Sequence, residues 1–96
     1  MTATSTVIRD IDVGIRGDFK IDYDIAHDFS KVIAKRFNPE SSLLAWHDKR
    51  KNACGPGEVC KTSSVVDLVE LERYGISHGG KLKISVDDGN YMFIYN

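Results

Sequence analysis

Two cysteines and a histidine have the most distinctive chemistry in this chain. Five residues separate Cys54 from Cys60 around a Gly-Pro-Gly turn, and His47 precedes both. Thiolates and an imidazole can bind zinc, but structural zinc sites usually place cysteines two to four residues apart and need further ligands. The same thiols could form a reversible pair if their Cα atoms came within about 7 Å. The simplest interpretation is two ordinary thiols, with Cys60 semi-buried and Cys54 exposed, that folding does not need, and the metal and redox sites are alternatives to it.

The run from Trp46 to Lys51 places an aromatic side chain before basic ones, which could stack a base beside neutralised phosphates. However, Asp48 interrupts the run, and 13 basic and 14 acidic residues give the chain a formal net charge of -1. A solvated strand end is therefore favoured, and we predict no nucleic-acid partner.

His27 is the third candidate, with acidic neighbours on an expected helix, but it lacks the convergent nucleophile and oxyanion donors that catalysis needs. The glycines match neither dinucleotide-binding nor Walker spacing. We therefore predict no catalytic residue and no cofactor, and expect that the protein is not an enzyme.

Hydrophobic spacing predicts the elements that position these residues. Residues 6–15 alternate as a strand does. Asp22 can cap a helix with apolar residues at steps of three and four, which Asn38-Pro39 ends. Residues 42–47 predict a second strand.

A long loop is expected over residues 50–62, followed by a second helix that begins at Ser63 or Ser64. Gly79 and Gly80 would end this helix in a left-handed cap. Gly75 lies inside it and costs about 1 kcal/mol relative to alanine, so an earlier end at Gly75 is the alternative.

The last residues give the sharpest structural signal, because Asp88-Gly89 between two alternating runs predicts a two-residue hairpin. That turn fixes the register and pairs Val86 with Tyr91. One face then carries the core, formed by Leu82, Ile84, Val86, Tyr91, Phe93 and Tyr95. The other face is mixed and carries Lys83, Ser85, Met92 and Ile94.

These elements predict an α+β fold in the order β-α-β-α-β-β. We expect a two-layer sandwich, with a four-stranded mixed sheet, both helices on one face and a C-terminal antiparallel hairpin. Residues 1–96 are expected to form one domain with a flexible N-terminus over residues 1–5. No secretory signal and no apolar run of about 20 residues is visible, which predicts a cytoplasmic protein without a membrane partner.

The mixed sheet face favours a non-enzymatic binding or self-association module. Lys83, Ser85, Met92 and Ile94 would form its surface, and an edge strand could pair with an unknown protein partner or with a second copy in a homodimer. The alternative function is a thiol redox or metal site built from Cys54, Cys60 and His47.

Three segments together resemble a small family of uncharacterised archaeal and bacterial proteins, many of them from anaerobes, that is catalogued as a domain of unknown function. The segments are residues 43–49, residues 58–60 and the stretch His78–Tyr95. The resemblance spans the chain from the first strand to the final hairpin. It implies a small stand-alone α+β protein and supplies no activity or site residue.

Overall fold

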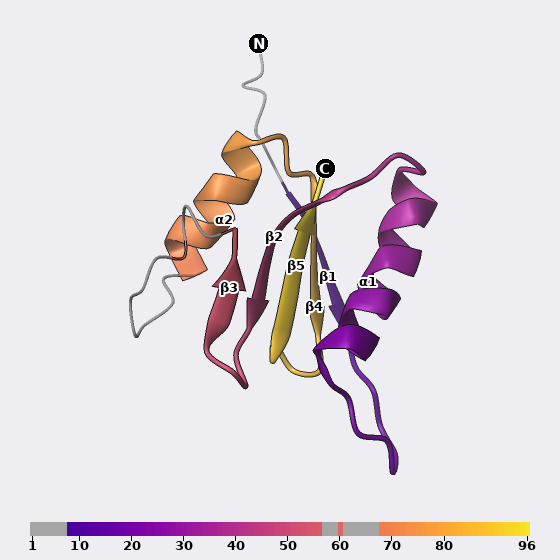
Figure 1. The fold of residues 1–96 in the computed structure, drawn as a ribbon. Helices are drawn as coiled ribbons and strands as arrows, with labels where there is room; N and C mark the ends of the chain where they lie inside the picture. The colour runs from indigo at the N-terminus through magenta and orange to yellow at the C-terminus, as the bar shows by residue number, and fades with distance from the viewer. Residues whose placement is uncertain (1–7, 57–59, 61–67) are drawn as a thin grey trace.

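A five-stranded mixed sheet with one helix on each face forms the domain (Figure 1). The computed structural model describes residues 8–56, 60 and 68–96. The strand order is β1-β4-β5-β2-β3, with only β1 and β4 paired in parallel. The elements are β1 (Arg9–Val13), α1 (Tyr23–Phe37), β2 (Leu43–Asp48), β3 (Ala53–Gly55), α2 (Leu68–Ser77), β4 (Leu82–Val86) and β5 (Tyr91–Tyr95).

The C-terminal hairpin has the predicted register. Val86 pairs with Tyr91 and Leu82 with Tyr95, and the Asn90 backbone N–H donates to the Asp87 carbonyl at 3.0 Å. Asp88 and Gly89 both have positive φ, as a type I′ turn requires. All six residues of the predicted core face are buried. The alternating sequence and the turn therefore determine the centre of the sheet.

α1 begins and ends where its capping residues predict. Asp22 Oδ1 accepts a hydrogen bond of 2.9 Å from the Ile25 backbone N–H, and Asn38 lies beyond the last turn in extended conformation. A buried 2.7 Å hydrogen bond joins Ser30 Oγ to the Tyr95 hydroxyl and fixes the helix over β5. The helix is thus tied to the sheet by polar as well as apolar contacts.

α2 lies on the other face of the sheet, so the prediction that both helices share one face is wrong (Figure 1). Leu71 of α2 packs in one cluster with Met92 and Ile94, whereas Ile84 and Phe93 pack in the cluster under α1. Every residue of β5 is buried, so both faces of this strand need a cover. The domain therefore has three layers instead of the predicted two.

Gly75 lies within α2 because the helix approaches the sheet closely there. A Cβ at this position would lie 2.8 Å from two side-chain atoms of Ile94. The helix then ends as predicted, since Gly79 has a φ of +93° and the Gly80 N–H donates to the Gly75 carbonyl at 2.7 Å. The predicted start at Ser63 or Ser64 lies outside the described residues.

β3 corrects the predicted strand number from four to five. It lies inside the segment expected to be a loop and pairs antiparallel with β2, with Ala53 opposite Asp48 and Gly55 opposite Trp46. Three residues are too few to show an alternating pattern. Pairing with β2, not the spacing within its own sequence, defines this strand.

Neither helix described here is long and apolar enough to cross a membrane.

Candidate functional site

The two cysteines are joined in a disulfide at the β3 edge of the sheet. Their Cα atoms are 5.8 Å apart, within the usual range for a disulfide. Cys54 lies in β3, and the Cys60 backbone N–H donates to the Pro56 carbonyl at 3.0 Å. Both residues are half-buried beside the cluster under α2. The disulfide therefore packs against the core, and both of its residues remain partly exposed to solvent.

His47 stands directly opposite Cys54 across the β2–β3 pair. Directly opposed residues of an antiparallel pair point to the same face with Cβ atoms about 5 Å apart, so the two side chains leave the sheet side by side. His47 is only 5% exposed, and Met92 of β5 flanks it on the other side. Burial lowers the pKa of His47, with Asp48 opposing this effect and Lys49 adding to it. The ring is therefore neutral at pH 7 and can accept a proton.

The structure thus brings together the three residues singled out as a metal or redox site. In the disulfide neither sulfur is a thiolate, which is the form that binds metal. Within residues 8–56, 60 and 68–96, no three His, Cys, Asp or Glu side chains gather as a metal site would require.

The predicted outer sheet surface is not an open face. Met92 is 6% exposed and Ile94 is fully buried beneath α2. Lys83 Nζ donates to Glu72 of α2 at 3.2 Å and lies 3.9 Å from a carboxylate oxygen of Asp10. Ser85 is half-buried. The four residues do not form one docking surface, because the apolar pair belongs to the core and Lys83 is held by ion pairs.

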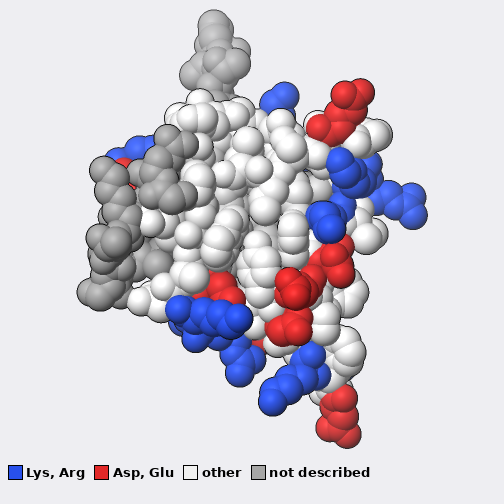
Figure 2. Space-filling model, in the orientation of Figure 1, with Lys and Arg blue, Asp and Glu red and all other residues white. Residues whose placement is uncertain are grey.

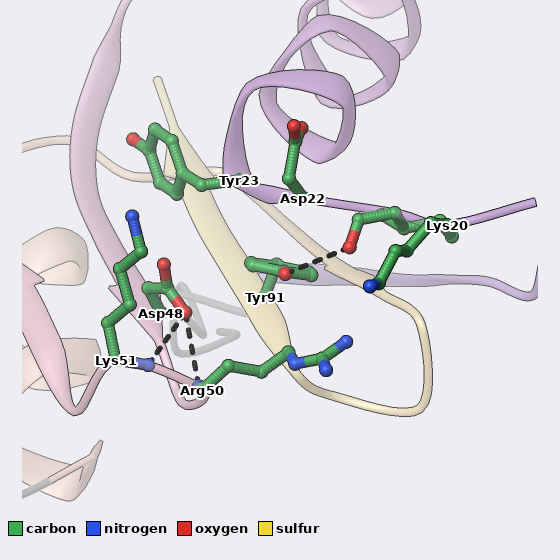
Figure 3. A pocket seen from close by; sticks show the side chains of 8 residues that line it. Lys20, Asp22, Tyr23, Asp48, Arg50, Lys51 and Tyr91 are labelled. Carbon is green, nitrogen blue, oxygen red and sulfur yellow. Dashed lines mark hydrogen bonds between the residues drawn. The ribbon is translucent and has the colours of Figure 1, made fainter.

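A cleft that the sequence did not predict lies where α1 begins and β2 ends (Figure 3). It comprises two adjoining hollows of about 270 Å³ and 340 Å³. Both are lined by Asp22, Tyr23, Asp48 and Lys51. Lys20, Ile21, Arg50 and Tyr91 complete the first hollow, and Asp24, Trp46 and Ala53 complete the second.

Asp48 shapes this cleft by folding the chain after β2. Its side chain is 3% exposed, and Oδ1 accepts from the backbone N–H groups of Arg50 at 3.1 Å and Lys51 at 3.2 Å. These bonds place the Arg50 and Lys51 side chains beside the cleft (Figure 3). Asp48 interrupts the basic run in the sequence, and in the structure it positions the two basic residues that follow it.

Two tyrosines form the inner wall of the cleft. The Tyr91 hydroxyl donates to the Ile21 carbonyl at 3.3 Å. Burial raises the pKa of Tyr91, and it raises the pKa of Tyr23 to about 12 with help from Tyr95, Asp24 and Asp48. Both phenols therefore stay protonated at neutral pH. Trp46 meets Tyr23 edge to face at a centroid distance of 5.2 Å.

The structural comparison shows the same fold, and none of the comparisons with known proteins assigns an activity. A family model described as a domain of unknown function (DUF5619) matches residues 8–95. The crystal structure of the novel protein AF1514 from Archeoglobus fulgidus DSM 4304 is similar, with a TM-score of 0.72, 22% identity and coverage of 94% of each chain. No curated protein matches.

Proposed function

The chain belongs to the DUF5619 family of unknown function, and from this premise we propose that it is a reversible thiol–disulfide module with Cys54 and Cys60 as its reactive pair. The observation that carries the proposal is the placement of both cysteines, 5.8 Å apart between Cα atoms, beside a buried histidine. The half-buried position of each cysteine supports exchange with an external thiol, which must reach a sulfur atom to react.

Oxidation of the reduced pair proceeds by thiol–disulfide exchange. His47 accepts the Cys54 thiol proton, and the thiolate attacks one sulfur of an external disulfide, whose other sulfur leaves as a thiolate. The Cys60 thiolate then attacks Cys54 in the mixed disulfide and releases the second external thiolate. In total two protons leave the cysteines, and two electrons reduce the external disulfide to two thiols.

His47 suits this role by its position opposite Cys54, and burial, which lowers its pKa, leaves the ring neutral at pH 7. A buried imidazole directly across from Cys54 can take the thiol proton without a diffusing base. The imidazolium that forms would face the thiolate, and this opposite charge offsets the effect of burial on the pKa of His47. His47 thus acts on the attacking cysteine, while Cys60 resolves the mixed disulfide.

If the protein is cytoplasmic, as the sequence predicts, the reduced pair would be the usual form and the disulfide would form in response to oxidation. Reducing thiols hold most cytoplasmic cysteine pairs open. The pair would then close on oxidation and reopen as reducing conditions return. The disulfide would then join β3 to Cys60 only in the oxidised protein.

Alkylation with mass measurement tests the reactive pair. The protein as purified in air is expected to add no iodoacetamide under denaturing conditions, and protein treated with dithiothreitol is expected to add two. A Cys60→Ser variant should instead give one reactive thiol or a disulfide-linked dimer. Two free thiols after exposure to oxidised glutathione would contradict the proposal.

The predicted binding or self-association module has less support, because its apolar surface residues Met92 and Ile94 are covered by α2. Its edge-strand version stays a prediction. β1 is the outer strand at one side of the sheet. Its charged residues Arg9, Asp10 and Asp12 are exposed, and charges at an edge strand disfavour pairing with another chain.

A further inference from the structure

The cleft between the start of α1 and the end of β2 carries charges that the thiol chemistry does not use. Lys20, Arg50 and Lys51 line it, and none of the three forms an ion pair with the residues that the structure describes. In Figure 3 the Arg50 side chain runs below Tyr91 toward Lys20, and the Lys51 ammonium rises toward Tyr23. In Figure 2 basic and acidic side chains lie together at the lower end of the molecule.

The first hollow is lined by three cationic side chains and by two carboxylates, Asp22 and Asp48, so the cations are in excess by one charge. Asp22 Oδ1 accepts from the Ile25 N–H at the start of α1. Asp48 Oδ1 accepts from two N–H groups of the turn that follows it. Both carboxylates keep their charge, and the excess of one cation in the first hollow favours an anionic group there.

The neighbouring hollow differs in character. Trp46 and Tyr23 provide its aromatic lining, and Asp24 adds an acceptor at its rim. Aromatic side chains beside cations are the combination that binds a nucleotide, since the ring packs against them while phosphate oxygens meet the cations. Each hollow is near the lower end of the size range of small-ligand pockets.

We propose that this cleft binds a small phosphorylated ring compound of the mononucleotide class. Its phosphate lies among Lys20, Arg50 and Lys51, where the guanidinium of Arg50 offers paired donors. Its ring lies against Tyr23 and Trp46. The run from Trp46 to Lys51 thus acts in a small-ligand site, with Asp48 folding it into position.

Titration of the full chain followed by amide NMR tests this site. Adenosine monophosphate is the probe, and inorganic phosphate and adenosine are its two halves. We expect the monophosphate to bind more tightly than either half, with shifts centred on residues 20–24 and 46–53. Equal affinity for inorganic phosphate would overturn the ring contact, equal affinity for adenosine would overturn the phosphate contact, and shifts elsewhere or none would overturn the site.

Variants of exposed cations make the test specific without disturbing the core. Arg50→Ala and Lys51→Ala should each weaken binding of the monophosphate about tenfold, the usual effect of losing one charged hydrogen bond. Lys31→Ala is the matched control, because Lys31 is an exposed lysine on α1 whose ion-pair partner is Asp28. Unchanged affinity in both cleft variants, or an equal loss in the control, would overturn the proposal.

Discussion

His47 of β2 and Cys54 of β3 are directly opposed across an antiparallel strand pair, with Met92 of β5 on the far side of the histidine. This relationship joins a proton acceptor to one end of a disulfide. It depends on β3, because without that strand Cys54 would lie in a loop with no fixed relation to the imidazole. The predictions below follow from this pair and from the packing that holds it.

Replacing His47 by glutamine should slow oxidation of the reduced pair. Glutamine retains polar side-chain atoms at the position but cannot accept the thiol proton, so the Cys54 thiol loses its nearby base. We expect the reaction with oxidised glutathione at pH 7 to slow at least roughly tenfold, since general bases of this kind typically contribute about 100-fold or more. Samples taken at successive times are alkylated, and the mass of the product gives the rate at which free thiols are lost.

The matched control for this experiment is His78→Gln, because His78 is exposed at the end of α2. Its rate should equal that of the unaltered protein. The difference between His47→Gln and the unaltered protein should shrink above about pH 9, where the thiol ionises without help. A rate unchanged by His47→Gln at pH 7 would remove the histidine from the mechanism.

Stability should rise with pH through the window below pH 6.5. Burial lowers the pKa of both His47 and His27 in the folded protein, whereas the unfolded chain keeps a value near 6.5. Between the lowered and ordinary values the unfolded chain binds more protons. The stability is therefore present above pH 6.5 and is lost as the pH falls through the folded-state pKa.

Urea unfolding at pH 5 and pH 7.5 measures this dependence. His47→Gln and His27→Gln should each reduce the change in unfolding free energy between the two conditions. His27 stacks on Phe93 with a centroid distance of 5.4 Å, so its variant also tests a ring contact in the core. An undiminished pH dependence in both variants would show that the carboxylates alone produce it.

Gly75→Ala should destabilise the protein although alanine favours helices. The added methyl group would meet two side-chain atoms of Ile94 at 2.8 Å, and Ile94 is fully buried. Overpacking of this kind costs about 1–3 kcal/mol. Gly14→Ala is the matched control, because nothing lies within 4 Å of a Cβ there. Chemical unfolding compares the two, and a Gly75→Ala protein as stable as the control would contradict the close helix–sheet contact.

Reduction of the disulfide should lower the free energy of unfolding by about 2 kcal/mol, because the bond closes a short loop in the unfolded chain. Cys54→Ser and Cys60→Ser should match the reduced protein. Both should retain the fold, since the sheet and the two helices bury the core independently of the bond. Urea unfolding with and without dithiothreitol gives the difference, and loss of folded structure on reduction would contradict it.

The hairpin and α1 could be predicted because their signals are local. The Asp88-Gly89 turn specifies its own register, and Asp22 specifies a helix start through a bond three residues away. The family resemblance was also confirmed. These features need no knowledge of which elements meet in space.

The helix arrangement and β3 could not be predicted because they depend on distant partners. Met92 and Ile94 indicated a mixed face, and only the path of α2 decides whether such a face meets solvent or a helix. Gly75 is the one local signal for the position of α2. In the sequence it indicates only a cost or a helix end, whereas in the structure it allows the helix to pack closely against the buried Ile94. The cleft depends on Asp48 turning the chain, which composition alone cannot show.

Equilibration of the protein in dithiothreitol redox buffers, with the fraction of disulfide measured after acid quenching and alkylation, tests whether Cys54 and Cys60 form a reversible thiol–disulfide pair. We expect one reversible two-electron transition between the Cys54–Cys60 disulfide and two thiols, the same from either direction and independent of protein concentration. A disulfide that does not re-form, or a transition that shifts with protein concentration, would contradict it.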